Sequence, residues 1–313
     1  MRKLRLTLVA AIAAATLAFA GCASDTPSAP DDSSAPGEGG EVAFFGVSNQ
    51  VPIITTLADT VTEYLGSKGY TVTVYDAEFD PVTQAQQIQQ ALDTGSLVAA
   101  WIFPVAAESL TESVAALQDA GIPMVIEADV ESFGFDGAQP GIVFNAADFS
   151  EFGVRVAEAA NECVAENGGT KALLLSASAV ASGADASHEA ITTNYTATDI
   201  VASAEAEDTA SAQTTVAQLL IAHPDADVVI AASDETSLGA IAAFQAAGKT
   251  PTCLIAGGGG PDVLSAQEAG EVTTVVAWDY AASAQTASDD LIELIADPTQ
   301  VGAVNSTVIQ VIE

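Results

Sequence analysis

The sequence predicts an α/β fold with two doubly wound parallel-sheet lobes, and three observations lead to it. Short apolar runs rich in β-branched residues alternate with longer stretches that carry Ala and Leu at helical spacing, as in strands joined by crossover helices. Several runs, such as 173–175 and 228–230, are apolar throughout, which is typical of strands buried on both faces. The alternation occurs in two successive series, so we expect two lobes of similar architecture.

The first series predicts strands at 42–48, 71–75, 97–103, 124–127 and 141–144, with helices at 53–67, 82–93 and 107–119. The second series predicts a helix at 150–166, then strands at 172–176, 200–204, 227–232, 253–256 and 273–277. Helices at 185–195, 209–222, 236–247 and 261–268 separate these strands, and a helix at 281–296 and a strand at 307–312 follow. Because helices should cover both faces of each sheet, binding is expected at the sheet edges.

The first forty residues are interpreted as targeting and tether sequence. Basic residues precede an apolar run at 6–20, which is too short to span a bilayer and is typical of a secretory signal, here 1–21. Cys22 closes the run and resembles a lipobox cysteine, with a chance cysteine as the alternative. Residues 22–40 contain no large apolar side chain and predict a lipidated cysteine and a disordered tether. We therefore expect the protein outside the cell, anchored by lipid to the outer face of the membrane.

Acidic residues dominate the composition, with 42 Asp and Glu against 7 Lys and Arg, and a net charge of −35. Beyond the signal peptide, the basic residues are Lys68, Arg155, Lys171 and Lys249. A nucleic-acid ligand is excluded, because little would neutralise its phosphates. The acids form no long block, so we interpret the charge as a solubility feature that does not by itself indicate a cationic ligand.

Two further cysteines, Cys163 and Cys253, follow Cys22 in the sequence. Outside the cytosol they are either joined in a disulfide or buried as reduced thiols, and the sequence leaves both alternatives open. Neither has metal-ligand spacing, and the histidines are His188 and His223 alone. We expect no metal site and no cofactor.

Polar residues follow several predicted strands, at the carboxyl ends where doubly wound sheets bind ligands. The candidates chosen on this basis are Asn49, Gln50, Glu127, Asp129, Ser233, Asp234, Gly258, Trp278 and Asp279. If the chain stays extended there, Glu127 and Asp129 point to the same side and accept hydrogen bonds from ligand hydroxyls or amines. A solvated loop is the alternative for this pair.

Other candidates also have alternative roles. Either Ser233 or Asp234 can cap the helix that begins near residue 236. Trp278 is predicted to stack on a ligand, with simple packing as the alternative, whereas Trp101 lies within an apolar run and is assigned to the core. The glycines at 257–260 lack the Lys and Ser or Thr of a phosphate loop, so we expect a flexible turn whose amides can approach a ligand.

Seven short motifs follow one another along residues 41–313. They are Val47-Ser48-Asn49-Gln50-Val51-Pro52, Gly69-Tyr70, Ile102-Phe103-Pro104, Ala120-Gly121-Ile122-Pro123, Ala222-His223-Pro224-Asp225, Ser233-Asp234-Glu235 and Leu238-Gly239-Ala240. In this order and spacing the chain resembles the periplasmic sugar-binding protein family of the ribose and galactose receptor type, the type I solute-binding proteins of ABC transporters.

The resemblance implies three chain crossings at a hinge, near 144–148, 277–279 and 297–307. It assigns 41–145 and 279–300 to an N-terminal lobe, and 146–278 and 301–313 to a C-terminal lobe. It further implies a monomer that captures a sugar or sugar-like compound by lobe closure and delivers it to an ABC transporter permease. A receptor of the same fold that signals to a membrane sensor is the alternative.

Several sugar contacts of that family are absent. Ser187 and His188 stand near an expected arginine and are included as ligand-binding candidates, and glycines replace a Gly-aromatic-Asp turn at 257–260. These departures weigh against a plain ribose-like ligand. A glycosidase with Glu127 and Asp234 as acid and base is the remaining rival, but no nucleophile elbow is present and a non-enzyme is expected.

Overall fold

The computed structural model describes residues 39–313 apart from 180 and 182. The predicted signal peptide at 1–21, the lipidation site at Cys22 and the tether as far as residue 38 lie outside the described residues. Within the described part of the chain, no helix combines the length and apolar character needed to cross a membrane.

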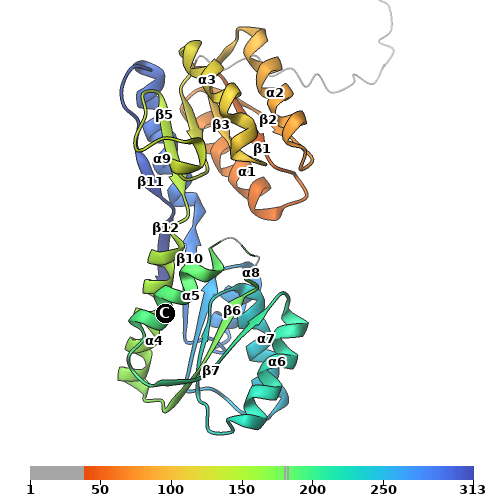
Figure 1. Ribbon diagram of the computed structural model, residues 1–313, viewed down its shortest axis with the longest axis vertical. Helices are drawn as coiled ribbons and strands as arrows, with labels where there is room; N and C mark the ends of the chain where they lie inside the picture. The colour runs from red at the N-terminus through yellow and green to blue at the C-terminus, as the bar shows by residue number, and fades with distance from the viewer. Residues whose placement is uncertain (1–38, 180, 182) are drawn as a thin grey trace, which may run out of the picture. The chain divides into compact units, whose positions relative to one another are not determined.

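The first sheet has six strands in the order β11-β5-β4-β3-β1-β2, and each neighbouring pair is parallel. They are β1 (Gly40–Gly46), β2 (Tyr70–Asp76), β3 (Leu97–Ile102), β4 (Met124–Ile126), β5 (Ile142–Ala146) and β11 (Val304–Ser306). Helices α1 (Pro52–Ser67) and α9 (Tyr280–Ala296) cover one face. Helices α2 (Pro81–Thr94) and α3 (Thr111–Asp119), with the short turns η1 (Ala107–Leu110) and η2 (Glu131–Phe133), cover the other (Figure 1). We call this unit the N-terminal lobe.

The second sheet has the order β12-β10-β9-β8-β6-β7. Its strands are β6 (Lys171–Ala177), β7 (Asp199–Ala206), β8 (Val228–Ala231), β9 (Cys253–Gly258), β10 (Thr274–Asp279) and β12 (Val308–Ile312). Helices α4 (Phe149–Asn167) and α5 (Ala184–Asn194) cover one face, and α6 (Thr209–Ala222), α7 (Asp234–Ala246) and α8 (Pro261–Glu268) cover the other (Figure 1). The edge strand β12 runs antiparallel to β10, whereas the other pairs are parallel. We call this unit the C-terminal lobe.

Strand β1 shows why helices are needed on both faces of these sheets. Val42 and Phe44 pack against α1 and α9, while Ala43 and Phe45 point to the opposite face and pack against α2 and α3. All four side chains are fully buried. An uninterrupted apolar run therefore satisfies two hydrophobic layers, which confirms the predicted doubly wound fold class.

Polar caps start several of the crossover helices. The Asp80 carboxylate accepts from the backbone N–H groups of Val82 and Thr83 at the start of α2. Asp208 and Ser211 form a reciprocal capping box at the start of α6. Such caps satisfy N–H groups that have no partner within the helix, so they fix where each helix begins.

The chain passes between the two sheets three times: after β5, where α4 begins, at the junction of β10 and α9, and at Thr307 between β11 and β12. The predicted lobe boundary at residue 301 needs correction. β11 pairs with β5, and Val301 bridges to Pro140, so residues 301–306 belong with the first sheet. The three-residue strand is partly exposed and contains no apolar run that the sequence could reveal.

A disulfide joins Cys163 of α4 to Cys253 of β9, with 6.0 Å between their Cα atoms. Of the two alternatives that the sequence left open, the structure therefore has the bonded form. Both residues are buried in the apolar cluster between α4 and the sheet, so the bond fixes this helix to the centre of the C-terminal lobe.

Candidate ligand-binding site

Both sheets have the same topological switch point. The strand order reverses between β1 and β3 in the N-terminal lobe, and between β6 and β8 in the C-terminal lobe. Doubly wound sheets bind ligands outside the carboxyl ends of strands at such a point. Asn49 and Gln50 follow β1 there with exposed side chains, and the Gln50 backbone N–H donates to Ser48 Oγ at 3.2 Å. Their predicted contact with a ligand stays a prediction.

A pocket of about 600 Å³ lies at the carboxyl end of the second sheet and receives residues from both lobes. The N-terminal lobe contributes Ile53 and Thr56 of α1, and the remaining lining comes from the C-terminal lobe and the second crossing: Asp234, Gly258, Gly259, Gly260, Pro261, Trp278, Asp279, Tyr280 and Ala281. The volume is in the range of small-molecule sites. Four predicted candidates, Asp234, Gly258, Trp278 and Asp279, therefore line one cavity.

Asp234 is held in place by the glycine loop. Its Oδ1 accepts hydrogen bonds from the backbone N–H groups of Gly259, at 3.0 Å, and Gly260, at 2.9 Å. Gly258 has a φ of +108°, and a Cβ there would lie 2.7 Å from the Asp234 carboxylate, so glycine is required. The amides of Gly259 and Gly260 thus donate to Asp234, whereas the sequence had predicted a flexible turn whose amides can approach a ligand. Burial raises the pKa of Asp234, while these hydrogen bonds lower it.

Helix capping falls to Ser233. Ser233 Oγ accepts from the Thr236 backbone N–H at 3.3 Å, and Thr236 Oγ1 accepts from the Ser233 backbone N–H at 3.1 Å. The next residue, Asp234, is the first residue of α7 and lines the pocket. Of the two possible capping residues, the structure therefore has Ser233 as the cap, and ligand contact by Ser233 or Asp234 stays a prediction.

Trp278 packs against α4 as well as lining the pocket. Its ring stacks on Phe152, with centroids 4.5 Å apart and planes at 12°, and meets the edge of Phe149 at 5.5 Å. One indole face is therefore covered by protein, and stacking of a ligand on Trp278 remains a prediction. Asp279 begins α9, where its Oδ1 accepts from the Ala282 backbone N–H at 2.9 Å.

Glu127 is occupied by its own lobe. Its Oε1 accepts from Trp101 Nε1 and its Oε2 from Asn145 Nδ2, both at 2.9 Å. Burial raises the pKa of Glu127 to about 7, because the two hydrogen bonds offset only part of the desolvation. The predicted core position of Trp101 is confirmed, since it is fully buried.

Glu127 and Asp129 do not form the pair that the sequence suggested. The chain bends at 127–128 instead of staying extended. Asp129 is exposed and lines a separate cavity of about 350 Å³ with Glu131, Asp148 and Asn305, among others. Side chains two residues apart point to the same side only where the backbone is extended, so the bend separates Glu127 from Asp129.

Ser187 and His188 lie on α5 outside the pocket lining. Ser187 is buried and its Oγ donates to the Phe149 carbonyl at 3.1 Å. The ring nitrogen Nδ1 of His188 lies 2.8 Å from Ser176 Oγ. Both polar groups thus connect α5 to neighbouring elements, and their contact with a ligand stays a prediction.

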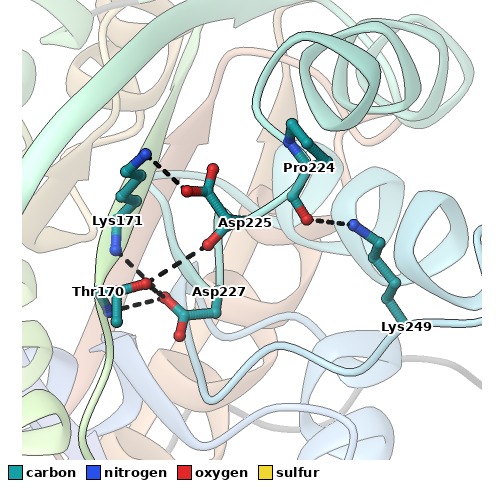
Figure 2. Close-up of polar contacts among 6 residues, drawn as sticks. All are labelled: Thr170, Lys171, Pro224, Asp225, Asp227 and Lys249. Carbon is teal, nitrogen blue, oxygen red and sulfur yellow. Dashed lines mark hydrogen bonds and ion pairs between the residues drawn. The ribbon is translucent and has the colours of Figure 1, made fainter.

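The basic side chains beyond residue 38 are engaged elsewhere. Lys171 Nζ lies 2.6 Å from Asp225 Oδ2, and Lys249 donates to the Pro224 carbonyl, which ties the loop before β8 to its surroundings (Figure 2). Arg155 pairs with two glutamates of its own helix, and Lys68 lies over the Tyr64 ring. No Lys, Arg or His is among the described residues that line the pocket. Among the described residues, no group of three or more His, Cys, Asp or Glu could hold a metal ion.

Comparison with known proteins decides the family. Residues 42–298 match the family model described as a periplasmic binding protein domain. The chain belongs to this family. The ribose import binding protein RbsB of Salmonella typhimurium is 26% identical over 234 residues, which cover 72% of this chain and 75% of the relative.

Solved structures of this periplasmic binding protein type share the fold. A periplasmic ribose ABC transporter protein from Conexibacter woesei superposes with a TM-score of 0.71 at 18% identity, covering 90% of this chain and 94% of that one. A periplasmic solute-binding protein from Actinobacillus succinogenes with bound D-allose gives 0.70 at 17% identity, covering 88% and 97%. The resemblance seen in the sequence motifs is thereby confirmed.

Two residues of this periplasmic binding protein were missed from the sequence. Tyr280 lines the pocket, and burial, followed by the charges of Glu127 and Asp234, raises its pKa to about 12. It directly follows Trp278 and Asp279 at the second crossing, so the strand-end rule extended by one residue would have found it. Asn145, the buried partner of Glu127, directly follows the predicted strand at 141–144, so the strand-end rule would also have found it, although it lies within β5 in the structure.

Proposed function

We propose that this periplasmic binding protein captures a sugar or sugar-like small molecule in the 600 Å³ pocket and delivers it to an ABC importer. The family membership supports a solute-binding role. Similarity to a ribose import binding protein and to a solute-binding protein with bound D-allose supports a sugar as the solute class. No catalytic step is part of the proposal.

The observation that carries the proposal is the mixed lining of the pocket. Ile53 and Thr56 come from α1 of the N-terminal lobe, while Asp234 and the glycine loop come from the C-terminal lobe. A ligand that contacts both lobes stabilises the arrangement in which both contacts are made, by its difference in affinity between the two arrangements. Hinge motion at the three crossings then turns occupancy into a shape that a permease can recognise.

Binding is tested by thermal shift and calorimetry with D-ribose, D-allose, L-arabinose and D-galactose. A ligand at about 100 times its Kd adds roughly 2.7 kcal/mol to the free energy of unfolding, which raises the melting temperature. Tyr280→Phe removes one pocket hydroxyl and should weaken the hit severalfold. Tyr195→Phe is the matched control, because that hydroxyl pairs with Thr198 away from the pocket lining. Equal affinities in both variants would contradict the site.

Lobe closure is tested by small-angle scattering with and without the hit. The radius of gyration should fall on binding, since closure brings the lobes together. An unchanged radius at saturating ligand would leave capture intact and refute closure.

The glycosidase rival meets a specific obstacle at Glu127. Both of its carboxylate oxygens already accept hydrogen bonds from Trp101 and Asn145, whereas a general acid needs a proton within reach of the scissile oxygen. We expect no turnover of aryl glycosides, and turnover that Glu127→Gln abolishes would overturn the non-enzyme proposal.

Membrane attachment through Cys22 forms the second part of the proposal and rests on the sequence of the signal region alone. We expect an acylated N-terminal cysteine in the mature protein, detectable by mass spectrometry, and release into the medium on Cys22→Ser. Loss of solute uptake on deletion of a partner permease separates a transport role from the signalling alternative.

A further inference from the structure

We propose that the ligand of this pocket is a polyhydroxylated ring that carries a protonated amine, such as an amino sugar, and that anionic sugars are rejected. The inference rests on the proposed function, because it specifies the chemistry of the same site. It follows from which hydrogen-bonding and charged groups the pocket offers, and from which it lacks.

Two carboxylates line the pocket with acceptor capacity to spare. Asp234 uses Oδ1 for the amides of Gly259 and Gly260, and Asp279 uses Oδ1 for the amide of Ala282. No described residue donates a hydrogen bond to Oδ2 of either carboxylate. Since an ionised carboxylate is a strong acceptor, a ligand can meet these oxygens with N–H or O–H donors.

No basic side chain compensates these charges. The described lining of the pocket contains no Lys, Arg or His. Two of the basic side chains pair with other acids: Lys171 with Asp225, and Arg155 with Glu151 and Glu158. A carboxylate withdrawn from water is costly without a positive partner. A bound ammonium group would provide that partner, whereas a carboxylate or phosphate on the ligand would add repulsion.

The electrostatic surroundings of Tyr280 point the same way. Burial and then the charges of Glu127 and Asp234, one from each lobe, raise the pKa of the Tyr280 hydroxyl. Asn145 donates to Glu127 through Nδ2, and its buried Oδ1 atom accepts no hydrogen bond from any described residue. The pocket lining has two aspartates and no basic side chain, which favours a cationic group beside Tyr280.

Two backbone amides of the glycine loop are already used by a carboxylate of the pocket. In the glycine loop, the N–H groups of Gly259 and Gly260 donate to Asp234. An anionic ligand at this loop would have to displace a carboxylate from them. These two amides therefore offer no free donor to an anion while Asp234 accepts from them.

Matched sugar sets test the inference by calorimetry at low ionic strength. One set is D-glucose, D-glucosamine, N-acetyl-D-glucosamine and D-glucuronate. The other is D-galactose with its three corresponding derivatives. We expect the amine to bind at least tenfold tighter than its neutral parent, N-acetylation to remove this advantage, and the uronates to bind more weakly than the parents. Added salt should reduce the advantage.

Variants connect the effect to the pocket. Asp234→Asn keeps an oxygen for the amides of Gly259 and Gly260 but removes the charge, so it should cut the preference for the amine at least fivefold. Asp279→Asn makes the same change at the second carboxylate and serves if the first variant fails to fold. Glu268→Gln, an exposed acid at the end of α8 outside the lining, is the control and should change nothing.

Different outcomes would contradict the amine preference and the proposed capture of a sugar. A neutral parent or a uronate that binds as tightly as its amine, or an amine preference untouched by both aspartate variants, overturns the inference and leaves sugar capture standing. Absence of binding by every neutral and charged sugar, including the four of the first screen, overturns the proposed function itself.

Discussion

The two lobes have the same strand order, yet the carboxylates that follow their strands differ in how many of their oxygens accept hydrogen bonds from the protein. In the N-terminal lobe, each carboxylate oxygen of Glu127 accepts a hydrogen bond, one from Trp101 and one from Asn145. In the C-terminal lobe, Asp234 uses one oxygen for the glycine loop and lines the pocket. A position after a strand therefore does not decide whether a carboxylate can meet a ligand. The donors on neighbouring strands decide it, because they can consume its acceptor capacity first.

The two tryptophans give the largest expected contrast between the lobes. Trp101 is fully buried, and Trp101→Ala should destabilise the protein by about 3–5 kcal/mol, as for other large-to-small core changes. Trp278 is only partly buried against Phe149 and Phe152, so Trp278→Ala should cost less. Urea unfolding followed by circular dichroism compares the two. A larger loss for Trp278→Ala would reverse the contrast.

The disulfide between Cys163 and Cys253 should stabilise the C-terminal lobe alone. Replacing Cys163 and Cys253 together with Ala should cost about 2–5 kcal/mol. Hydrogen exchange should then accelerate in α4 and β9 of the C-terminal lobe and stay unchanged in the first sheet. Dithiothreitol should reproduce the loss in the wild type and have no effect on the double variant, and equal acceleration in both lobes would refute a local effect.

The Glu127 carboxylate of the N-terminal lobe predicts that stability depends on pH. The pKa of folded Glu127 is raised from 4.5 to about 7, so the folded protein retains a proton that the unfolded chain releases between these values. Its contribution to stability is complete below about pH 4.5 and is lost as the pH rises through 7, by up to roughly 3 kcal/mol.

Glu127→Gln should therefore match the wild type near pH 4 and exceed its stability near pH 8, as measured by chemical unfolding at each pH. The amide stays neutral throughout, and rotation of the Asn145 side chain can restore a donor–acceptor match. A stability difference that does not change with pH would show that Glu127 does not titrate in this window.

The smallest expected effect separates capping from binding on α7. Ser233→Ala removes the side-chain acceptor for the Thr236 amide and should cost about 1 kcal/mol. Ligand affinity should stay within twofold, because only the next residue lines the pocket. A tenfold loss of affinity without a change in the unfolding midpoint would place Ser233 in contact with the ligand.

Most of the fold could be predicted from the sequence because burial on both faces leaves a dense apolar signal. Phe44 and Phe45 in β1 and Leu173 to Leu175 in β6 are examples. Strand β11 was missed for the opposite reason, since Val304–Ser306 is partly exposed and pairs only through its backbone with β5. The antiparallel direction of β12 likewise has no trace in residue pattern.

Candidate site residues could be predicted where they follow a strand directly, and not where the backbone bends before them. Asp234, Trp278 and Asp279 follow strands directly and were found by the strand-end rule. Asp129 lies beyond a bend and lines a different cavity. Which donors reach a carboxylate depends on strands far apart in sequence, as with Trp101, Glu127 and Asn145, so no local pattern could reveal that Glu127 is already occupied.

The bond between Cys163 and Cys253 also has a consequence for where the chain is folded. The family works outside the cytosol, and cytosolic thiols are kept reduced. A newly made chain therefore lacks the cross-link, which spans 90 residues of sequence, until it has been exported. We therefore expect the C-terminal lobe to be less stable before export than after it, by about 2–5 kcal/mol, so that the reduced chain unfolds more readily than the oxidised one.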